Sequence, residues 1–407
     1  MTRSDPPREP PDLFAGLAFD TLAVHAGAEP DELAGAVAPP IYQTSTYAQD
    51  GVGRPRRGYE YARTQNPTRD RLERAVAMLE GGRDGIAFAS GSATTAALAE
   101  LAPTGTEVVV GDDVYGGTFR YFERVRRQNG VDTRYVDLAA GADALWEALT
   151  ERTRLIWFET PTNPHLRVVD VAAMVAAVRE RYPDEDPPGR PLVVVDNTFA
   201  SPALQRPLAL GADVVFHSAT KYLAGHSDVV AGVAVTNDDA VAERLRFLQN
   251  AAGAIPGPFD CFLVLRGLRT LHLRMARHVE NAVAVARFLG ERADVERVHY
   301  PGLVPQPLVG AGCQMAAGGG MVSFVLAPAN GRSAEARARA FAEATRLFTL
   351  AESLGGIESL VELPAAMTHA SVAGSELEVS PALVRLSVGI EAADDLVADV
   401  ARALDAA

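Results

Sequence analysis

The sequence predicts an α/β protein in which a large domain with a mostly parallel sheet is followed by a smaller C-terminal α/β domain. Two observations lead to this prediction. Short apolar runs rich in β-branched residues alternate along the chain with stretches of helical periodicity, an order typical of βαβ units. In addition, Leu192–Val195 is apolar at every position, as a strand requires when helices cover both faces of its sheet.

The large domain is expected to alternate between strands and helices. We expect its strands at residues 85–89, 107–111, 133–136, 155–159, 192–195, 214–217 and 229–236. We expect its helices at residues 69–80, 93–101, 118–129, 142–149, 170–181 and 238–250. The segment 183–191, rich in Pro and acidic residues, is expected to be a surface loop between two of these elements.

The two ends of the chain differ in character from this alternating part. Residues 1–68 form a turn-rich arm, which cannot bury much by itself and is expected to contact a neighbouring subunit; its first 18 residues are expected to be disordered. After residue 258 a long helical stretch, from about 260 to 292, is expected to lead into the small domain, with strands at 321–326 and 383–388 and helices at 334–344 and 392–403. The predicted parts are therefore an arm (1–68), a large domain (69–259) and a small domain (260–407).

The composition excludes several classes of protein. The 407 residues are 48% hydrophobic with mean hydropathy near zero, which indicates a soluble globular protein without a membrane-spanning stretch. A formal net charge of −14 argues against nucleic acid or an anionic membrane as partner. Cys261 and Cys313 are the only cysteines, so a cytoplasmic protein without a disulfide framework is expected, and neither has the spacing of a metal site.

Lysine is almost absent from the chain. Of 38 lysines and arginines, Lys221 is the one lysine. Arginine is effectively always protonated, whereas lysine can lose its proton and form a Schiff base. Every other basic side chain of the Lys/Arg type is arginine. The single lysine therefore indicates a task that needs a neutral amine. The alternative is that one lysine remained by chance.

The neighbours of Lys221 favour the chemical interpretation. Asp196 ends the strand 192–195, and Lys221 follows the strand 214–217. Ligands of open α/β sheets bind beyond the carboxyl ends of the strands, where both residues are expected. A carboxylate that keeps a pyridine nitrogen protonated and a lysine that carries an aldehyde are what pyridoxal phosphate requires. The alternative for Asp196 is an aspartate that caps a loop.

A phosphate of such a cofactor requires backbone N–H groups at a helix N-terminus. Ser90–Ser92, with Gly91 at its centre, lies between a predicted strand and a predicted helix and qualifies, although Ser-Gly-Ser is also an ordinary connection. Ser218 and Thr220 could add hydroxyl donors. Neither a nucleoside triphosphate loop nor a dinucleotide fingerprint occurs in the sequence.

Four further residues are candidates for cofactor or substrate binding. Tyr115 follows the strand 107–111 and could stack on a planar cofactor, or could simply be a half-buried loop tyrosine. Glu159 and Asn163 end or follow the strand 155–159 and could hold polar substituents of the ring. Arg385 lies in an apolar strand, where a substrate carboxylate or an internal salt bridge would satisfy it.

Eight runs of the sequence resemble the pyridoxal-phosphate enzymes of Cys/Met metabolism, from about residue 21 to the C-terminus. They are YARTQNPTR (61–69), DDVYGGTFR (112–120), ETPTNP (159–164), VDNTFASP (195–202), HSATKYLAGHSD (217–228), AESLGGIESL (351–360), MTHAS (367–371) and LVRLSVGIE (383–391). The resemblance implies a fold type I, aminotransferase-like large domain, the cofactor pyridoxal 5'-phosphate, an amino-acid substrate, and a homotetramer built from dimers that share active sites.

The resemblance also implies roles for individual residues. Lys221 would carry the cofactor, Asp196 would face the pyridine nitrogen, and Tyr115 would stack on the ring with Asn163 near its phenolic oxygen. The phosphate of the same subunit would be bound by Gly91, Ser92, Ser218 and Thr220. The phosphate of the adjacent subunit would be bound by Tyr61 and Arg63. The substrate carboxylate would be bound by Ser353 and Arg385. Lys221, once free, would act as the general base at Cα and Cβ, with Tyr115 assisting proton transfer.

Within the family, the runs 348–360 and 245–250 resemble the γ-lyase branch. The activity that the resemblance favours is therefore γ-elimination on L-cystathionine. The alternative is γ-replacement on an O-acylhomoserine by cysteine (γ-synthase branch). Gly116 stands where methionine γ-lyases resemble one another in carrying Cys, which argues against that branch. Glu352 could meet the distal ammonium of cystathionine, or it could be a solvated glutamate. A third alternative is a catalytically silent relative that only binds the cofactor.

Overall fold

The computed structural model describes residues 16–183, 189–329 and 331–407. Its centre is a seven-stranded sheet in which only β9 runs antiparallel to its neighbours. The spatial order is β3 (Asp84–Phe88), β9 (Gly232–Thr236), β8 (Val214–Ser218), β7 (Leu192–Asp196), β6 (Thr153–Glu159), β4 (Glu107–Gly111) and β5 (Asp132–Val136). The prediction of a mostly parallel sheet is therefore confirmed.

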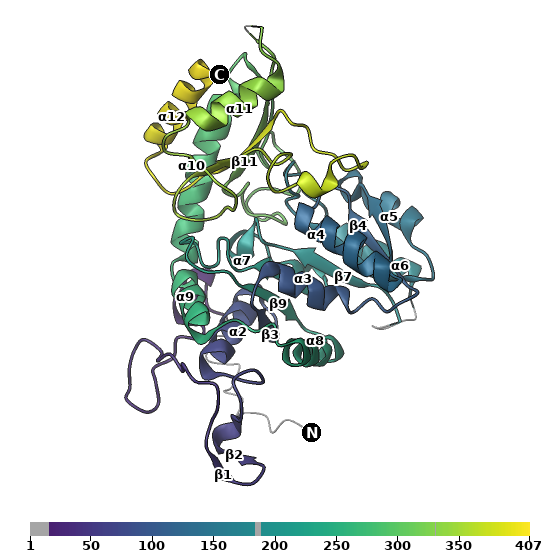
Figure 1. The fold of residues 1–407 in the computed structure, drawn as a ribbon, viewed down its shortest axis with the longest axis vertical. Helices are drawn as coiled ribbons and strands as arrows, with labels where there is room; N and C mark the ends of the chain where they lie inside the picture. The colour runs from purple at the N-terminus through teal and green to yellow at the C-terminus, as the bar shows by residue number, and fades with distance from the viewer. Residues whose placement is uncertain (1–15, 184–188, 330) are drawn as a thin grey trace.

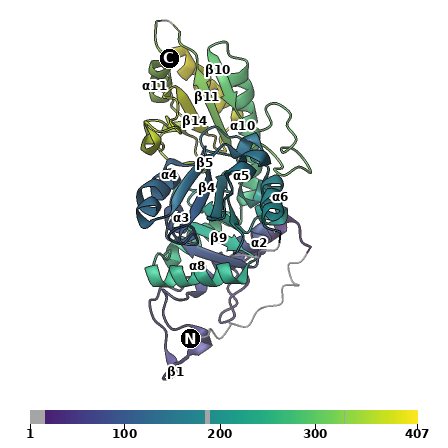
Figure 2. The same ribbon diagram turned by 90° about the vertical axis from the view of Figure 1, so that its right-hand side faces the viewer.

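Helices cover both faces of this sheet. One face carries α3 (Gly91–Ala99), α4 (Gly116–Tyr121) and α8 (Asp239–Ala252), and the other carries α2 (Pro67–Glu80), α5 (Ala142–Ala148) and α6 (Val171–Arg181). Figure 2 shows the sheet between α3 and α4 on one side and α6 on the other. Alternate residues of each strand enter the two cores, which explains why the central strands carry continuous apolar runs such as Leu192–Val195 of β7.

Local signals in the sequence set the helix ends. Asn66 begins α2 by accepting hydrogen bonds from the backbone N–H groups of Thr68 and Arg69, with Pro67 at the first helical position. Gly81 ends it with a left-handed backbone, φ 73°, which a side chain would disfavour. The boundaries predicted from the sequence therefore agree with the observed ones to within a few residues.

A second sheet forms the other end of the molecule, beside the C-terminus (Figure 1). Its order is β10 (Val295–His299), β11 (Met321–Leu326), β14 (Leu383–Ser387), β13 (Leu360–Glu362) and β12 (Thr349–Leu350). The helices α10 (Leu271–Gly290), α11 (Ala334–Ala344) and α12 (Ala393–Ala406) pack on it around a separate core. The smaller C-terminal α/β unit is confirmed, although β10, β12 and β13 were not predicted.

The long helical stretch expected at about 260–292 consists of two helices, α9 (Pro258–Leu268) and α10. The helix α9 ends at Leu268, directly after Gly267, where a Cβ would lie only 2.2 Å from the carbonyl oxygen of Ala224. The Gly267 carbonyl oxygen accepts hydrogen bonds from the Arg274 guanidinium, at 2.6 Å, and from the Thr270 backbone N–H. The Arg274 side chain and the Thr270 N–H thus satisfy a carbonyl oxygen at the end of α9, where the chain turns.

The arm contains more structure than the sequence indicated. It includes α1 (Phe19–His25) and a short hairpin of β1 (Gln49–Gly51) and β2 (Arg54–Pro55), which projects at the end opposite the second sheet (Figure 1). The short helix α7 (Ser201–Leu204) follows β7. The expected disorder of residues 1–18 lies largely outside the described residues, as does most of the loop 183–191. The proposed division into an arm and two domains stays a prediction.

The helix expected at 118–129 begins earlier and changes its winding. It starts as α4, continues as a π turn over Phe122–Arg126 and a 3-10 turn over Arg127–Asn129, and ends at Gly130 with φ 75°. In the described part of the chain, no helix is long and apolar enough to cross a membrane. Both cysteines are free, Cys261 in the core and Cys313 exposed.

Candidate active site

Lys221 lies three residues beyond the end of β8 and is held by the loop between β12 and β13. Its Nζ donates a hydrogen bond to Ser353 Oγ at 2.9 Å. Ser353 has φ 100°, an unfavourable backbone for a residue with a side chain, and such strain is found mostly at functional sites. The structure thus brings together two predicted site residues that are 132 positions apart.

The pKa of Lys221 lies well below that of an ordinary lysine. Burial disfavours the ammonium form and, with the nearby Arg385 charge, lowers the pKa to about 8, against the opposing effect of Glu362, Glu352 and Asp196. Glu352 is exposed, so it contributes as a solvated charge rather than as a contact. A lysine with this pKa is available as a neutral amine near neutral pH.

Asp196 ends β7 opposite Glu159 of β6 in the strand register. Its Oδ1 accepts a hydrogen bond from the Thr198 backbone N–H at 2.9 Å. Burial raises the pKa of Asp196 to about 6, although the Thr198 hydrogen bonds and the charges of His217 and Lys221 act in the opposite direction. No salt bridge to Asp196 occurs among the described residues. A buried acid in this state would be stabilised as a carboxylate by a further cation, such as a protonated pyridine nitrogen.

The N-terminus of α3 forms a cradle beside the end of β8. Ser90 caps the helix by accepting a hydrogen bond from the Ala93 N–H at 3.0 Å, which leaves the N–H groups of Gly91 and Ser92 at the open end. A Cβ at Gly91 would lie 3.0 Å from both Cβ and Oγ of Ser218, so glycine allows the N-terminus of α3 to lie close to Ser218. Gly91, Ser92 and Ser218 therefore fit a phosphate.

Thr220 fits this cradle less well than predicted. Its Oγ1 donates to the Ala231 carbonyl oxygen at 3.2 Å and accepts from the Ala231 N–H at 3.1 Å. The hydroxyl proton is thereby engaged with the backbone. Its assignment to the phosphate stays a prediction.

Arg385 is 2% exposed and has three partners. It donates to Asn163 Oδ1 at 2.7 Å and to the Ser353 carbonyl oxygen at 3.4 Å, and it forms a 2.9 Å ion pair with Glu362, its neighbour in β13. The internal salt bridge that the sequence left open is therefore present. The arrangement also brings Arg385, Ser353 and Asn163 together, and Glu362 is the residue that sequence reasoning missed.

Tyr115 begins α4 beside the carboxyl end of β4, as expected. Its backbone N–H donates to Glu159 Oε1 at 2.8 Å, and its side chain is 38% exposed. Burial raises the pKa of Glu159 well above its usual range, and the nearby Asp196 charge acts in the same direction. Glu159 therefore supports the Tyr115 backbone, and its contact with the cofactor ring stays a prediction.

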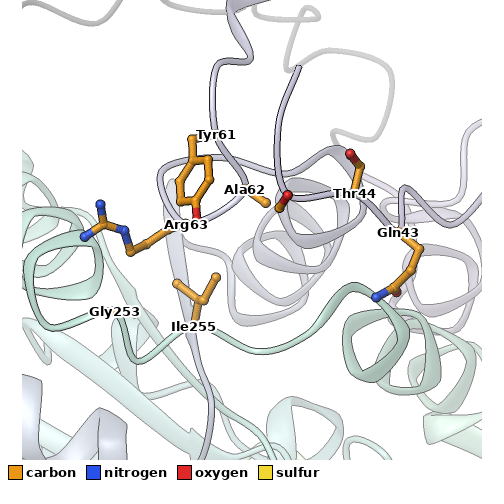
Figure 3. A pocket seen from close by; sticks show the side chains of 8 residues that line it. Gln43, Thr44, Tyr61, Ala62, Arg63, Gly253 and Ile255 are labelled. Atoms are coloured by element: carbon orange, nitrogen blue, oxygen red, sulfur yellow. The ribbon is translucent and has the colours of Figure 1, made fainter. Parts of the chain in front are cut away.

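The arm residues Tyr61 and Arg63 lie in a different place. They line a pocket of about 340 Å3, and Figure 3 shows them beside Ile255, which follows α8. Arg63 donates to the Asn250 carbonyl oxygen at 3.1 Å. The pocket lining includes neither Lys221 nor Asp196. The predicted role of these residues at an adjacent subunit stays a prediction.

Comparisons with known proteins agree with this geometry. The chain matches the family described as Cys/Met metabolism PLP-dependent enzyme over residues 20–405. The chain belongs to this family. Its cofactor is pyridoxal 5'-phosphate. The cradle at α3 fits the phosphate of this cofactor, Asp196 fits its ring nitrogen, and Lys221 fits its aldehyde. In the described ranges, no cluster of His, Cys, Asp and Glu forms a metal site.

Individual members of the family are similar along nearly their whole length. A cystathionine gamma-synthase from Mycobacterium tuberculosis is 54% identical, covering 94% of this chain and 96% of the relative. A cystathionine gamma-lyase from Dictyostelium discoideum is 48% identical, covering 95% and 97%. The solved structure of metB from Corynebacterium glutamicum superposes with a TM-score of 0.90 at 46% identity, covering 96% of this chain and 98% of that one. The predictions of family, fold class and cofactor are confirmed.

The lowered pKa of Lys221 predicts how the apoprotein takes up its cofactor. Because only the neutral amine attacks an aldehyde, we expect the uptake rate to rise about tenfold per pH unit below pH 8 and to level off above it. Stopped-flow absorbance between pH 6 and 9.5 measures this rate. Nα-acetyllysine amide is the control, since its amine has the ordinary pKa of about 10.4. A protein profile parallel to that of the control would contradict the low pKa.

Proposed function

We propose that this chain is a cystathionine γ-synthase, which joins the sulfur of L-cysteine to Cγ of an O-acylhomoserine and releases the acyl group as a carboxylate. The observation that supports this most is the greater identity to a γ-synthase than to a γ-lyase. The sequence alone led us to expect γ-lyase first, on the basis of two short runs. Similarity over nearly the whole chain carries more weight than those runs, so the order is reversed.

The residues of the site support such a γ-replacement. The bound cofactor supplies an electron sink for charge that develops at Cα and Cβ of the substrate. Asp196 keeps the ring nitrogen protonated, and Ser353 and Arg385 hold the substrate carboxylate. Lys221, with its low pKa, removes the proton at Cα and moves protons at Cβ. Tyr115 stacks on the ring and is exposed enough to reach the departing group.

Gly91, Ser92 and Ser218 hold the phosphate in this proposal, and Thr220 lies at its edge. Tyr61 and Arg63 serve the phosphate of an adjacent subunit in a homotetramer. Their exposure, and the pocket that they line away from Lys221, support this arrangement. We propose a cytoplasmic enzyme, in keeping with its free cysteines.

A γ-lyase is the second candidate. It hydrolyses L-cystathionine to L-cysteine, 2-oxobutanoate and ammonia. Glu352 supports both activities, because cystathionine is the substrate of one and the product of the other, and an exposed carboxylate can meet its distal ammonium. The choice between the two therefore depends on the relative rates of transfer to cysteine and to water.

Parallel reactions of the holoenzyme test the proposal. One contains O-succinyl- or O-acetylhomoserine with L-cysteine and is assayed for cystathionine, and the other contains L-cystathionine and is assayed for 2-oxobutanoate. We expect the first reaction to be at least about tenfold faster in kcat/KM, a difference of roughly 1.4 kcal/mol in barrier. Equal rates or faster cleavage would overturn the γ-synthase assignment. No turnover in either would indicate the catalytically silent relative.

A further inference from the structure

The segment Thr368–Ser371, part of the MTHAS run, packs directly against the loop that carries Tyr115. Ser371 Oγ donates to the Gly116 carbonyl oxygen at 2.6 Å. A Cβ at Gly116 would lie 2.4 Å from the Thr368 carbonyl oxygen, a distance that no relaxed side chain tolerates. The absence of a side chain at 116 thus allows a close contact between two segments 255 residues apart.

His369 is the centre of this contact. Its ring meets the Tyr115 ring edge-on, with centroids 6.3 Å apart and planes at 88°, a favourable aromatic geometry. Its Nε2 lies 3.2 Å from the carbonyl oxygen of Asn163. Burial and the nearby Arg385 charge lower the pKa of His369 to about 4, so the ring is neutral at physiological pH. Since a carbonyl only accepts, the single ring proton belongs on Nε2.

The other ring nitrogen connects His369 to the substrate-carboxylate site. Nδ1, which carries no proton, lies 3.0 Å from Thr368 Oγ1, and the single hydroxyl proton of Thr368 is shared between Nδ1 and Glu362 Oε1, which lies 2.6 Å from the same hydroxyl. Glu362 in turn pairs with Arg385, whose Nη1 donates to Asn163 Oδ1. These polar contacts form a closed ring that starts at the Asn163 carbonyl and returns to the Asn163 side chain.

We propose that His369 is a positioning residue, which fixes the Tyr115 ring over the cofactor and fixes Arg385 toward the substrate carboxylate at the same time. It touches neither cofactor nor substrate and acts through Tyr115, Asn163 and Glu362. The ring of contacts includes Asn163, which follows β6 of the first sheet, and Glu362 and Arg385 of the second sheet. One side chain therefore orients both the group that meets the cofactor and the group that meets the substrate carboxylate. This inference requires the cofactor and the roles of Tyr115 and Arg385, and does not depend on whether the reaction is synthesis or cleavage.

Two substitutions of His369 separate positioning from packing. His369→Phe keeps an aromatic edge against Tyr115 but loses both nitrogen contacts, whereas His369→Gln retains an amide N–H that can donate to the Asn163 carbonyl oxygen. We expect His369→Phe to raise the dissociation constant for pyridoxal 5'-phosphate about tenfold, to raise KM for the amino-acid substrate about tenfold, and to change the visible circular dichroism of the bound cofactor. We expect His369→Gln to remain within about threefold of the parent.

His278 provides a matched control. It is equally buried, its ring meets Tyr222 edge-on at 5.1 Å, and its Nδ1 lies 2.7 Å from the Val388 carbonyl oxygen. His278→Phe should lower Tm by a similar amount, with cofactor affinity and visible dichroism unchanged. If His369→Phe kept the cofactor affinity and the dichroism of the parent well below its Tm, or if His278→Phe altered both as strongly, the positioning role would be overturned.

A milder substitution keeps the test available if His369→Phe does not fold. Ser371→Ala removes only the hydrogen bond to the Gly116 carbonyl oxygen. We expect the same changes in the same direction, about threefold in cofactor affinity and substrate KM. Unchanged values for a folded Ser371→Ala protein would overturn the proposal. If the parent protein itself showed no absorbance band of bound cofactor, the proposed function would be refuted instead.

Discussion

Replacing Lys221 with alanine is expected to reduce kcat by about four orders of magnitude or more. The substitution removes both the amine that carries the cofactor aldehyde and the base placed beside the substrate Cα, and general acid–base catalysis alone contributes about 10²–10⁴-fold. Among the described residues, the Lys221 side chain has one hydrogen-bond partner, Ser353 Oγ, so its loss should leave the fold intact. Steady-state rates and the thermal unfolding midpoint measure the two effects.

The near absence of lysine gives this experiment an unusually direct readout. Borohydride reduction of the holoenzyme should fix one cofactor on the chain, and peptide mapping should place it on Lys221 rather than on the N-terminal amine, because no other lysine exists. The alanine variant should show no such adduct, and Lys221→Arg should also show none, because guanidinium does not form the linkage. A variant that retained a tenth of the parental kcat would remove the basis of the proposed mechanism.

The central part of the fold could be predicted because burial on both faces leaves a simple pattern in the sequence. β7 is apolar until Asp196, and β8 begins with three apolar residues before the polar pair His217 and Ser218. β10 could not be predicted, since none of its residues is fully buried and its polar and apolar residues are mixed. The break after α9 depends on the Arg274 guanidinium, which bonds the carbonyl oxygens of Gly267 and Tyr222. Such a contact is tertiary and has no local signal.

The same distinction holds for the site. Lys221 and Asp196 could be predicted from their positions after strands, because parallel strands bring their carboxyl ends to one edge. The partners of Arg385 could not, since Glu362 reaches it through the pairing of β13 with β14 and β13 is only three residues long. His369 was visible only as part of a run similar to the family. Its contacts with Tyr115 and Asn163 join segments separated by more than 200 residues.

Replacing Arg385 with leucine should produce two large effects with separate causes. It leaves the Glu362 carboxylate, which is 1% exposed, without its charge partner, and breaking one side of a buried pair costs about 3–5 kcal/mol of unfolding free energy. It also removes the cation that we assign to the substrate carboxylate, for which we expect KM to rise about 100-fold. Denaturant unfolding and substrate titration measure these effects independently.

The double variant Arg385→Leu/Glu362→Leu distinguishes the structural from the functional task of Arg385. An apolar pair avoids the unpaired buried charge, so most of the lost stability should return. The raised KM should persist, because no cation remains for the substrate carboxylate. Glu362→Leu alone is the control for loss of the acid. If the double variant recovered KM together with stability, Arg385 would be a structural residue, and the substrate carboxylate would have to be bound elsewhere.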